Sequence, residues 1–131
     1  MKYLLLSSFS AVLLPISWPT YGTPFFIFVA FVPLLLLAHD ISKFSKIKRK
    51  GWAIFALSFL VFAIWNIVTT GWLYNSLSPD GTPSLMAVII PVVANSLLMS
   101  LTFMSYSWFK RAQGTYFGLV FFIAIWMSFE K

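Results

Sequence analysis

Few residues in this chain could carry chemistry, and they do not gather into a recognisable reactive pattern. The sequence of 131 residues has no cysteine, one histidine and three acidic residues. It therefore offers no disulfide, no thiolate nucleophile and no thiolate metal ligand. The sequence also lacks nucleophilic triads, phosphate-binding loops and metal-ligand clusters. We expect no catalytic, cofactor-binding or metal-binding residue here, no cofactor, and no activity from this chain alone.

The most conspicuous polar side chains are two asparagines inside long apolar runs, Asn66 and Asn95. A buried amide in hydrocarbon needs a partner, and a hydrogen bond between membrane helices contributes about 1 kcal/mol. At ~1.5 Å per residue, Asn66 and Asn95 lie roughly 12 Å and 16 Å from the same ends of consecutive helices. The two could meet or share a polar neighbour, and Thr69 and Thr70 extend the stripe. We interpret these four residues as interhelical contacts rather than as a ligand site.

Three ionisable residues stand at the ends of apolar runs. His39 and Asp40 are adjacent at the end of the second run, where a solvated pair fits better than a proton relay. Glu130 closes the last run, near Trp126, and ionisable residues at membrane depth are functional candidates. The cost of a charge is smaller at an interface, so we retain Glu130 as a possible functional carboxylate at the outer interface.

Five apolar runs must position these residues. The chain is 60% hydrophobic and 9% charged, whereas a soluble domain carries about 25% charged residues. A membrane-spanning helix needs about 20 apolar residues, and the interfacial Trp18 and Tyr21 lengthen the two short runs beside them. The first run lacks the small-residue cleavage site of a signal peptide, so we expect it to be retained. The prediction is an all-α membrane protein in one domain, residues 1–131, with about five transmembrane helices near residues 3–16, 24–38, 51–74, 84–109 and 115–129.

Two local features of these runs predict how the helices bend and pack. Pro91 frees a backbone carbonyl inside the fourth run and predicts a kink, and Pro33 is interpreted in the same way in the second run. Ser96 and Ser100 form a small-xxx-small face, which lets a neighbouring helix approach closely.

The positive charges lie between the apolar runs. Five cations fall within residues 43–50, Lys110 and Arg111 form a second cluster, and Lys2 precedes the first run. This is the positive-inside pattern of membrane proteins. Cations beside a membrane need no ligand beyond lipid headgroups, so the net charge of +6 does not indicate a nucleic-acid partner. We expect a cytoplasmic N-terminus and, after an odd number of spans, a periplasmic C-terminus.

Several segments, taken in order, resemble the start of bacterial apolipoprotein N-acyltransferases. The opening hairpin is Leu14-Pro15-Ile16-Ser17-Trp18-Pro19 followed by Phe31-Val32-Pro33-Leu34-Leu35. The segment Gly71-Trp72-Leu73-Tyr74-Asn75-Ser76-Leu77 is similar to the ending of that family's third helix. The closing Trp126-Met127-Ser128-Phe129-Glu130 is similar to its helix end with an aromatic residue and a glutamate. The resemblance covers the whole chain.

The resemblance implies the function of a larger enzyme, of which this chain would form only a part. The family moves an acyl chain from a phospholipid to the N-terminal cysteine amine of an apolipoprotein, through a thioester on the cysteine of a Glu-Lys-Cys triad. The implied partners are membrane lipids, with phospholipid as acyl donor, the apolipoprotein substrate and the rest of the same enzyme chain. The implied location is the bacterial inner membrane, which the chain would cross several times. Neither Glu130 nor Lys131 is assigned to the triad, because the chain has no cysteine.

Two functional hypotheses follow. Glu130-Lys131 comes directly after an apolar run, so we expect a fragment whose continuation lies on the outer side and holds the catalytic domain. This chain would then anchor the domain in the membrane. The alternative is a complete small multi-pass membrane protein, either a transporter subunit or a scaffold.

Overall fold

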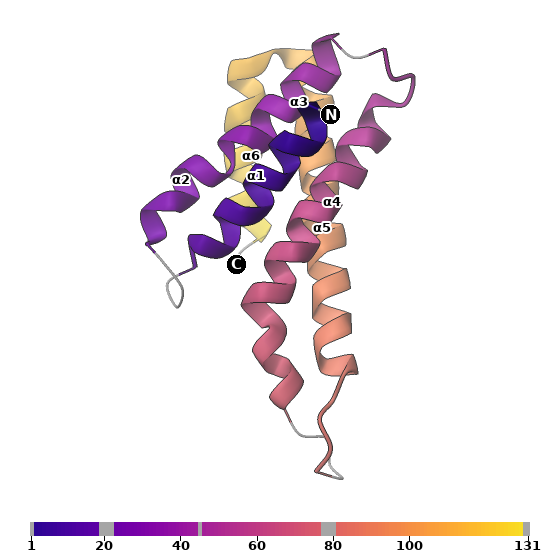
Figure 1. Cartoon of the computed structure of the whole chain (residues 1–131). Helices are drawn as coiled ribbons and strands as arrows, with labels where there is room; N and C mark the ends of the chain where they lie inside the picture. The colour runs from indigo at the N-terminus through magenta and orange to yellow at the C-terminus, as the bar shows by residue number, and fades with distance from the viewer. Residues whose placement is uncertain (1, 19–22, 45, 77–80, 130–131) are drawn as a thin grey trace.

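The structure, a computed structural model, describes residues 2–18, 23–44, 46–76 and 81–129. All regular elements of two or more residues in this part of the chain are helices, which confirms the all-helical prediction (Figure 1). They are α1 (Lys2–Ile16), the 3₁₀ helix η1 (Pro24–Phe26), α2 (Ile27–Ala30), α3 (Val32–Phe44), α4 (Lys50–Thr70), the 3₁₀ helix η2 (Gly71–Asn75), α5 (Met86–Gln113) and α6 (Thr115–Phe129).

Two helical segments are long and apolar enough to cross a membrane: α4 with its continuation η2, and α5. Only 33% of the most apolar stretch of each is buried inside the protein, so most of that surface faces outward. The 28 residues of α5 extend for about 42 Å, whereas the hydrocarbon core of a bilayer is about 30 Å thick. Helices α1 and α6 have 15 residues each and extend for about 22 Å.

The second apolar run is not one continuous helix, because the chain turns at Phe31. Pro33 is the second residue of α3, a first-turn position where the missing N–H of proline costs nothing. At the break the Phe31 N–H donates to the carbonyl of Val29. Helix α3 then continues to Phe44, beyond the predicted end of the run. Helix α5, in contrast, continues through Pro91 as a single element.

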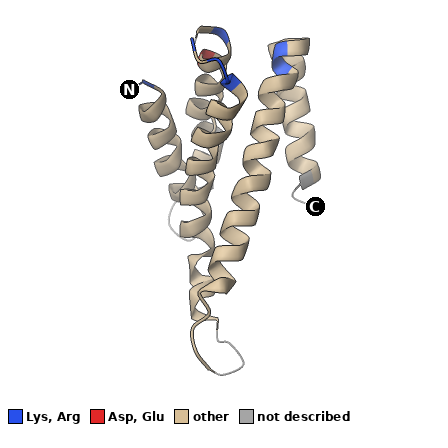
Figure 2. Ribbon diagram, turned by 90° about the vertical axis from the view of Figure 1, so that its right-hand side faces the viewer, with Lys and Arg blue, Asp and Glu red and all other residues tan. Residues whose placement is uncertain are grey.

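The long helices α4 and α5 lie side by side and antiparallel, and the shorter helices pack around only part of their length. Helix α1 contacts α3 and α4, and α6 packs along α5. In Figures 1 and 2, α4 and α5 both extend well past the ends of α1, α2 and α6. The described end of α6 therefore lies beside the middle of the α4–α5 pair.

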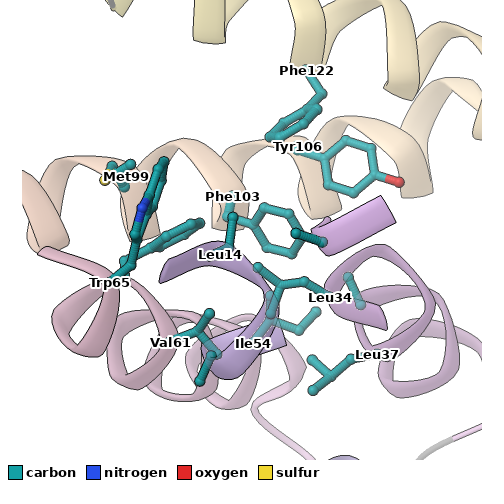
Figure 3. Close-up of a cluster of buried hydrophobic side chains, with 14 of the residues drawn as sticks. Leu14, Leu34, Leu37, Ile54, Val61, Trp65, Met99, Phe103, Tyr106 and Phe122 are labelled. Carbon is teal, nitrogen blue, oxygen red and sulfur yellow. The ribbon is translucent and has the colours of Figure 1, made fainter. Parts of the chain in front are cut away.

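An aromatic cluster joins the turn at Phe31 to α4 and α6, and Phe31 is at its centre. The Phe31 ring lies 6.4 Å from those of Phe62 and Trp65, 6.0 Å from that of Phe122 and 5.1 Å from that of Trp126. The aliphatic part of the same core comes from α1, α3 and α4 and includes Leu14, Leu34, Leu37, Ile54 and Val61 (Figure 3). The turn at Phe31 thus places one ring in contact with rings of both α4 and α6.

Two glycines, Gly114 between α5 and α6 and Gly118 in the first turn of α6, allow these helices to pack closely. Gly114 has φ +94° and ψ 172°, a conformation that is essentially restricted to glycine. Gly118 lies against Lys110, and a Cβ there would come within 2.8 Å of the Lys110 Cβ and 3.0 Å of its Cα. The two helices consequently approach more closely than any other side chain at position 118 would allow.

Candidate functional site

The amide of Asn66 connects α4 to α5 in the interior of the bundle. Its Nδ2 donates to the Phe62 carbonyl at 2.8 Å, to Ser96 Oγ at 3.3 Å and to Met99 Sδ at 3.5 Å. Asn66 is 7% exposed and Ser96 is fully buried, so the contact lies in the interior of the bundle. These contacts bridge the helices through Ser96, one member of the small-xxx-small face.

The other polar residues predicted from the sequence make different contacts. Asn95 is partly buried, and its side chain makes no hydrogen bond to any described residue. Thr69 and Thr70 donate to carbonyls of their own helix, Trp65 at 2.9 Å and Asn66 at 2.6 Å respectively. In the structure Asn66 therefore contacts Ser96, the residue after Asn95. The two threonine hydroxyls bond within α4.

Glu130 lies outside the residues that the structure describes. Its neighbour Trp126 is part of the aromatic cluster, where its ring also lies 5.8 Å from that of Phe62. In the same cluster the indole N–H of Trp65 is buried with no hydrogen-bond acceptor among the described residues.

His39 and Asp40 contact different helices, although they are adjacent in the chain. Asp40 pairs with Lys2 of α1 at 2.5 Å, and the hydrogen bond that Lys2 donates to Asp40 raises the pKa of Lys2 above its ordinary value. His39 Nδ1 lies 3.0 Å from the ammonium nitrogen of Lys110 on α5. Successive helical residues point about 100° apart, which explains the separation. The two residues consequently do not form a relay with each other.

These contacts belong to an end of the bundle where the cations gather. Figure 2 shows the described lysines and arginines at one end, on the tips of α1, α3, α4 and α5 and the loop between α3 and α4. Lys50 donates to the Ser42 carbonyl at 2.9 Å, and Ser42 and Ser107 share a hydrogen bond of 3.1 Å between α3 and α5. The basic end is thus fastened across helices by side-chain hydrogen bonds.

Besides the Lys2–Asp40 ion pair and the Lys50–Ser42 hydrogen bond, three further cross-helix contacts were missed in the sequence: Ser10 to the Ala30 carbonyl, Ser42 to Ser107 and Lys110 to His39. A signal for the first was present, because Ser7, Ser10, Ala11 and Leu14 follow the i, i+3, i+4, i+7 spacing of one helix face. All four are buried. The other two joined residues about 65–71 positions apart, and no local pattern relates them.

The described residues form an apolar helical bundle with an interhelical amide contact and a basic end. Among the described residues, no group of three histidine or acidic side chains could hold a metal ion. The fold and its two long apolar helices place the chain in the class of helical domains with segments able to cross a membrane.

Comparison with protein families is more specific. Residues 10–131 match the family described as apolipoprotein N-acyltransferase N-terminal domain. The chain therefore belongs to this family, as the resemblance in the sequence predicted. No curated protein and no solved structure matches the chain.

Proposed function

We propose that this chain is the membrane-embedded N-terminal part of an apolipoprotein N-acyltransferase and anchors its catalytic domain in the bacterial inner membrane. The observation that carries the proposal is the family match over residues 10–131. In this proposal the chain crosses the membrane several times, with its basic end in the cytoplasm. The enzyme transfers an acyl chain from phospholipid to the N-terminal cysteine amine of an apolipoprotein, and Glu130 remains a candidate carboxylate at the outer interface.

The apolar outer surface supports a role in the bilayer. Large side chains such as Leu60, Ile67, Ile90 and Leu101 are 55%, 54%, 64% and 45% exposed along α4 and α5. Exposed apolar surface of this extent is costly in water but favourable in lipid. The anchor would hold the catalytic domain at the membrane surface, where its phospholipid donor and lipid-bearing acceptor are found.

The reading frame beyond codon 131 tests the proposal directly. We expect it to continue into further helices and a domain with a cysteine nucleophile. A stop codon directly after codon 131 would contradict the proposal and favour the small multi-pass alternative.

Removing the anchor from the continued reading frame tests its role. We expect a variant without residues 1–131 to lose transfer of a radiolabelled acyl chain from phospholipid to a diacylated lipopeptide in isolated membranes. A matched variant that keeps these residues and replaces the nucleophilic cysteine should stay in the membrane and be equally inactive. Full transfer by the shortened protein would show that the segment is dispensable.

A further inference from the structure

A hollow of about 290 Å³ lies at the basic end between α3 and the α5–α6 hairpin. Its polar part is formed by His39, Lys110 and Thr115, and its apolar part by Val32, Leu36 and Leu119. Val32 and His39 are seven residues apart on α3, so the lining changes from apolar to polar over about 10 Å. A lipid with its polar headgroup at the basic end and its acyl chain pointing away from that end would match this change in the lining.

The ammonium group of Lys110 is held in place at the polar part of this hollow. It lies 3.0 Å from His39 Nδ1 and 5.6 Å from the centre of the Tyr106 ring. The close contact with Gly118 fixes the base of the side chain. An ammonium group has three N–H donors, so the bond to His39 leaves two for another acceptor.

The charge of Lys110 is not neutralised by a carboxylate of the described chain. Asp40, the acidic residue beside His39, is paired with Lys2 on a different helix. A partly buried cation with no counter-ion among the described residues, in a hollow that Thr115 and His39 also line, favours binding of a phosphate group. The lining thus supplies charge complementarity for an anion.

The apolar part of the hollow is open on its outer side. Val32, Leu36 and Leu119 are 43%, 51% and 37% exposed. These side chains offer an acyl chain a surface that continues directly from the phosphate position. A free phosphate ion would use only the polar part, whereas an anionic phospholipid would use both.

We propose that this groove binds one anionic phospholipid, with its phosphate at Lys110, His39 and Thr115 and an acyl chain along Val32, Leu36 and Leu119. The inference goes beyond the proposed function, because the acyl donor is expected in the outer leaflet and this lipid belongs to the leaflet at the basic end. The bound lipid joins α3 to the α5–α6 hairpin and supplies the missing counter-ion of Lys110.

A second hollow on the other side of α5 provides a matched control. It has about 310 Å³ and is lined by residues that include Trp52, Trp108 and Arg111. Arg111 is adjacent to Lys110 and carries the same charge, but its Nε donates to the Ser107 carbonyl at 3.3 Å. Replacing Arg111 therefore changes the surface charge equally without touching the proposed site.

Native mass spectrometry of the full chain, released from nanodiscs of phosphatidylglycerol and phosphatidylcholine, tests the proposal. We expect one phosphatidylglycerol to be retained in preference to phosphatidylcholine. Lys110→Gln should weaken retention about tenfold, the usual loss for one hydrogen bond to a charged group. Lys110→Arg should restore most of it, and Arg111→Gln should change it less than about threefold.

Three outcomes would overturn the proposal: no preference for phosphatidylglycerol, equal losses in Lys110→Gln and Arg111→Gln, or full displacement of the lipid by millimolar inorganic phosphate. The last two would assign binding to general surface charge or to a free phosphate ion. If Lys110→Gln does not fold, Leu36→Phe replaces it. This exposed substitution fills the apolar part and should displace the lipid without removing a hydrogen bond.

Discussion

The side-chain amide of Asn66 is largely buried between the two long helices. Its Nδ2 donates to the Phe62 carbonyl on its own helix and to Ser96 on α5, and only the second of these bonds requires α4 and α5 to stay together. A hydrogen bond of this kind contributes about 1 kcal/mol to membrane-helix association. The Asn66–Ser96 contact therefore favours one alignment of the two long helices along each other.

Replacing Asn66 should separate this contact from the general effect of losing an amide. We expect Asn66→Ala to lower the free energy of unfolding by about 1 kcal/mol, measured by denaturant titration of the chain in mild detergent. Asn95→Ala is the matched control, because the Asn95 side chain has no hydrogen bond among the described residues. Equal losses in both variants would show that the Asn66–Ser96 contact contributes nothing specific.

The polar residues inside the apolar runs are conspicuous in the sequence, but their partners are not. Asn95 and Ser96 are about 100° apart around the helix axis, so a small rotation of α5 decides which of them faces α4. The rotation depends on packing of the surrounding core, including Met99 and Phe103, and not on the polar residues themselves. The sequence thus predicted a polar contact near this depth, whereas only the structure assigns it to Ser96.

The break between α2 and α3 was likewise only partly predictable from the sequence. Pro33 marks the position in the sequence, because its missing N–H is tolerated in the first turn of a new helix. The bond that supports the break comes from Ser10 of α1, whose Oγ donates to the Ala30 carbonyl at 2.9 Å. Ser10 and Ala30 are separated by a turn and are related only after the helices pair. Local pattern therefore predicted an irregularity, and tertiary packing determined its form.

The two buried serines of α1 allow a test of this cross-helix bond. Ser10→Ala should cost about 1 kcal/mol of unfolding free energy, because it removes a buried hydrogen bond between elements. Ser7 bonds only to the Tyr3 and Leu4 carbonyls of its own helix, so Ser7→Ala should change stability by no more than about 0.5 kcal/mol. The same detergent titration measures both. A larger loss for Ser7→Ala would contradict this account of the break.

For the molecule as a whole, the distribution of charge relates the fold to the proposed orientation. Lysines and arginines that are far apart in the sequence gather at one end of the described bundle (Figure 2). Helical class and family could be predicted from the sequence, because apolar runs and cation positions are properties of the chain itself. The runs at residues 51–74 and 84–109 were also predicted to be the longest, but how the shorter helices pack along α4 and α5 is seen only in the structure (Figure 1).

Single cysteines introduced at the two ends of the bundle formed by residues 1–131 test the proposed orientation, because these residues contain no cysteine of their own. Thr82 and Gln113 are both exposed and uncharged, and they lie at opposite ends of α5. In intact cells we expect an impermeant maleimide to label Thr82→Cys, and to label Gln113→Cys only after the membrane is permeabilised. The reverse pattern would place the basic end outside and contradict the proposed topology.

The one-sided charge also has an electrical consequence. Eight of the nine lysines and arginines, together with Asp40, leave seven net positive charges at the basic end. Moving one elementary charge against an inside-negative potential of about 100 mV requires about 2.3 kcal/mol. Turning the bundle over in an energised membrane would therefore require roughly 16 kcal/mol of electrical work, more than the folding stability of many domains. In the proposed orientation, respiration itself would keep the anchor from inverting, and a collapsed potential would remove that barrier.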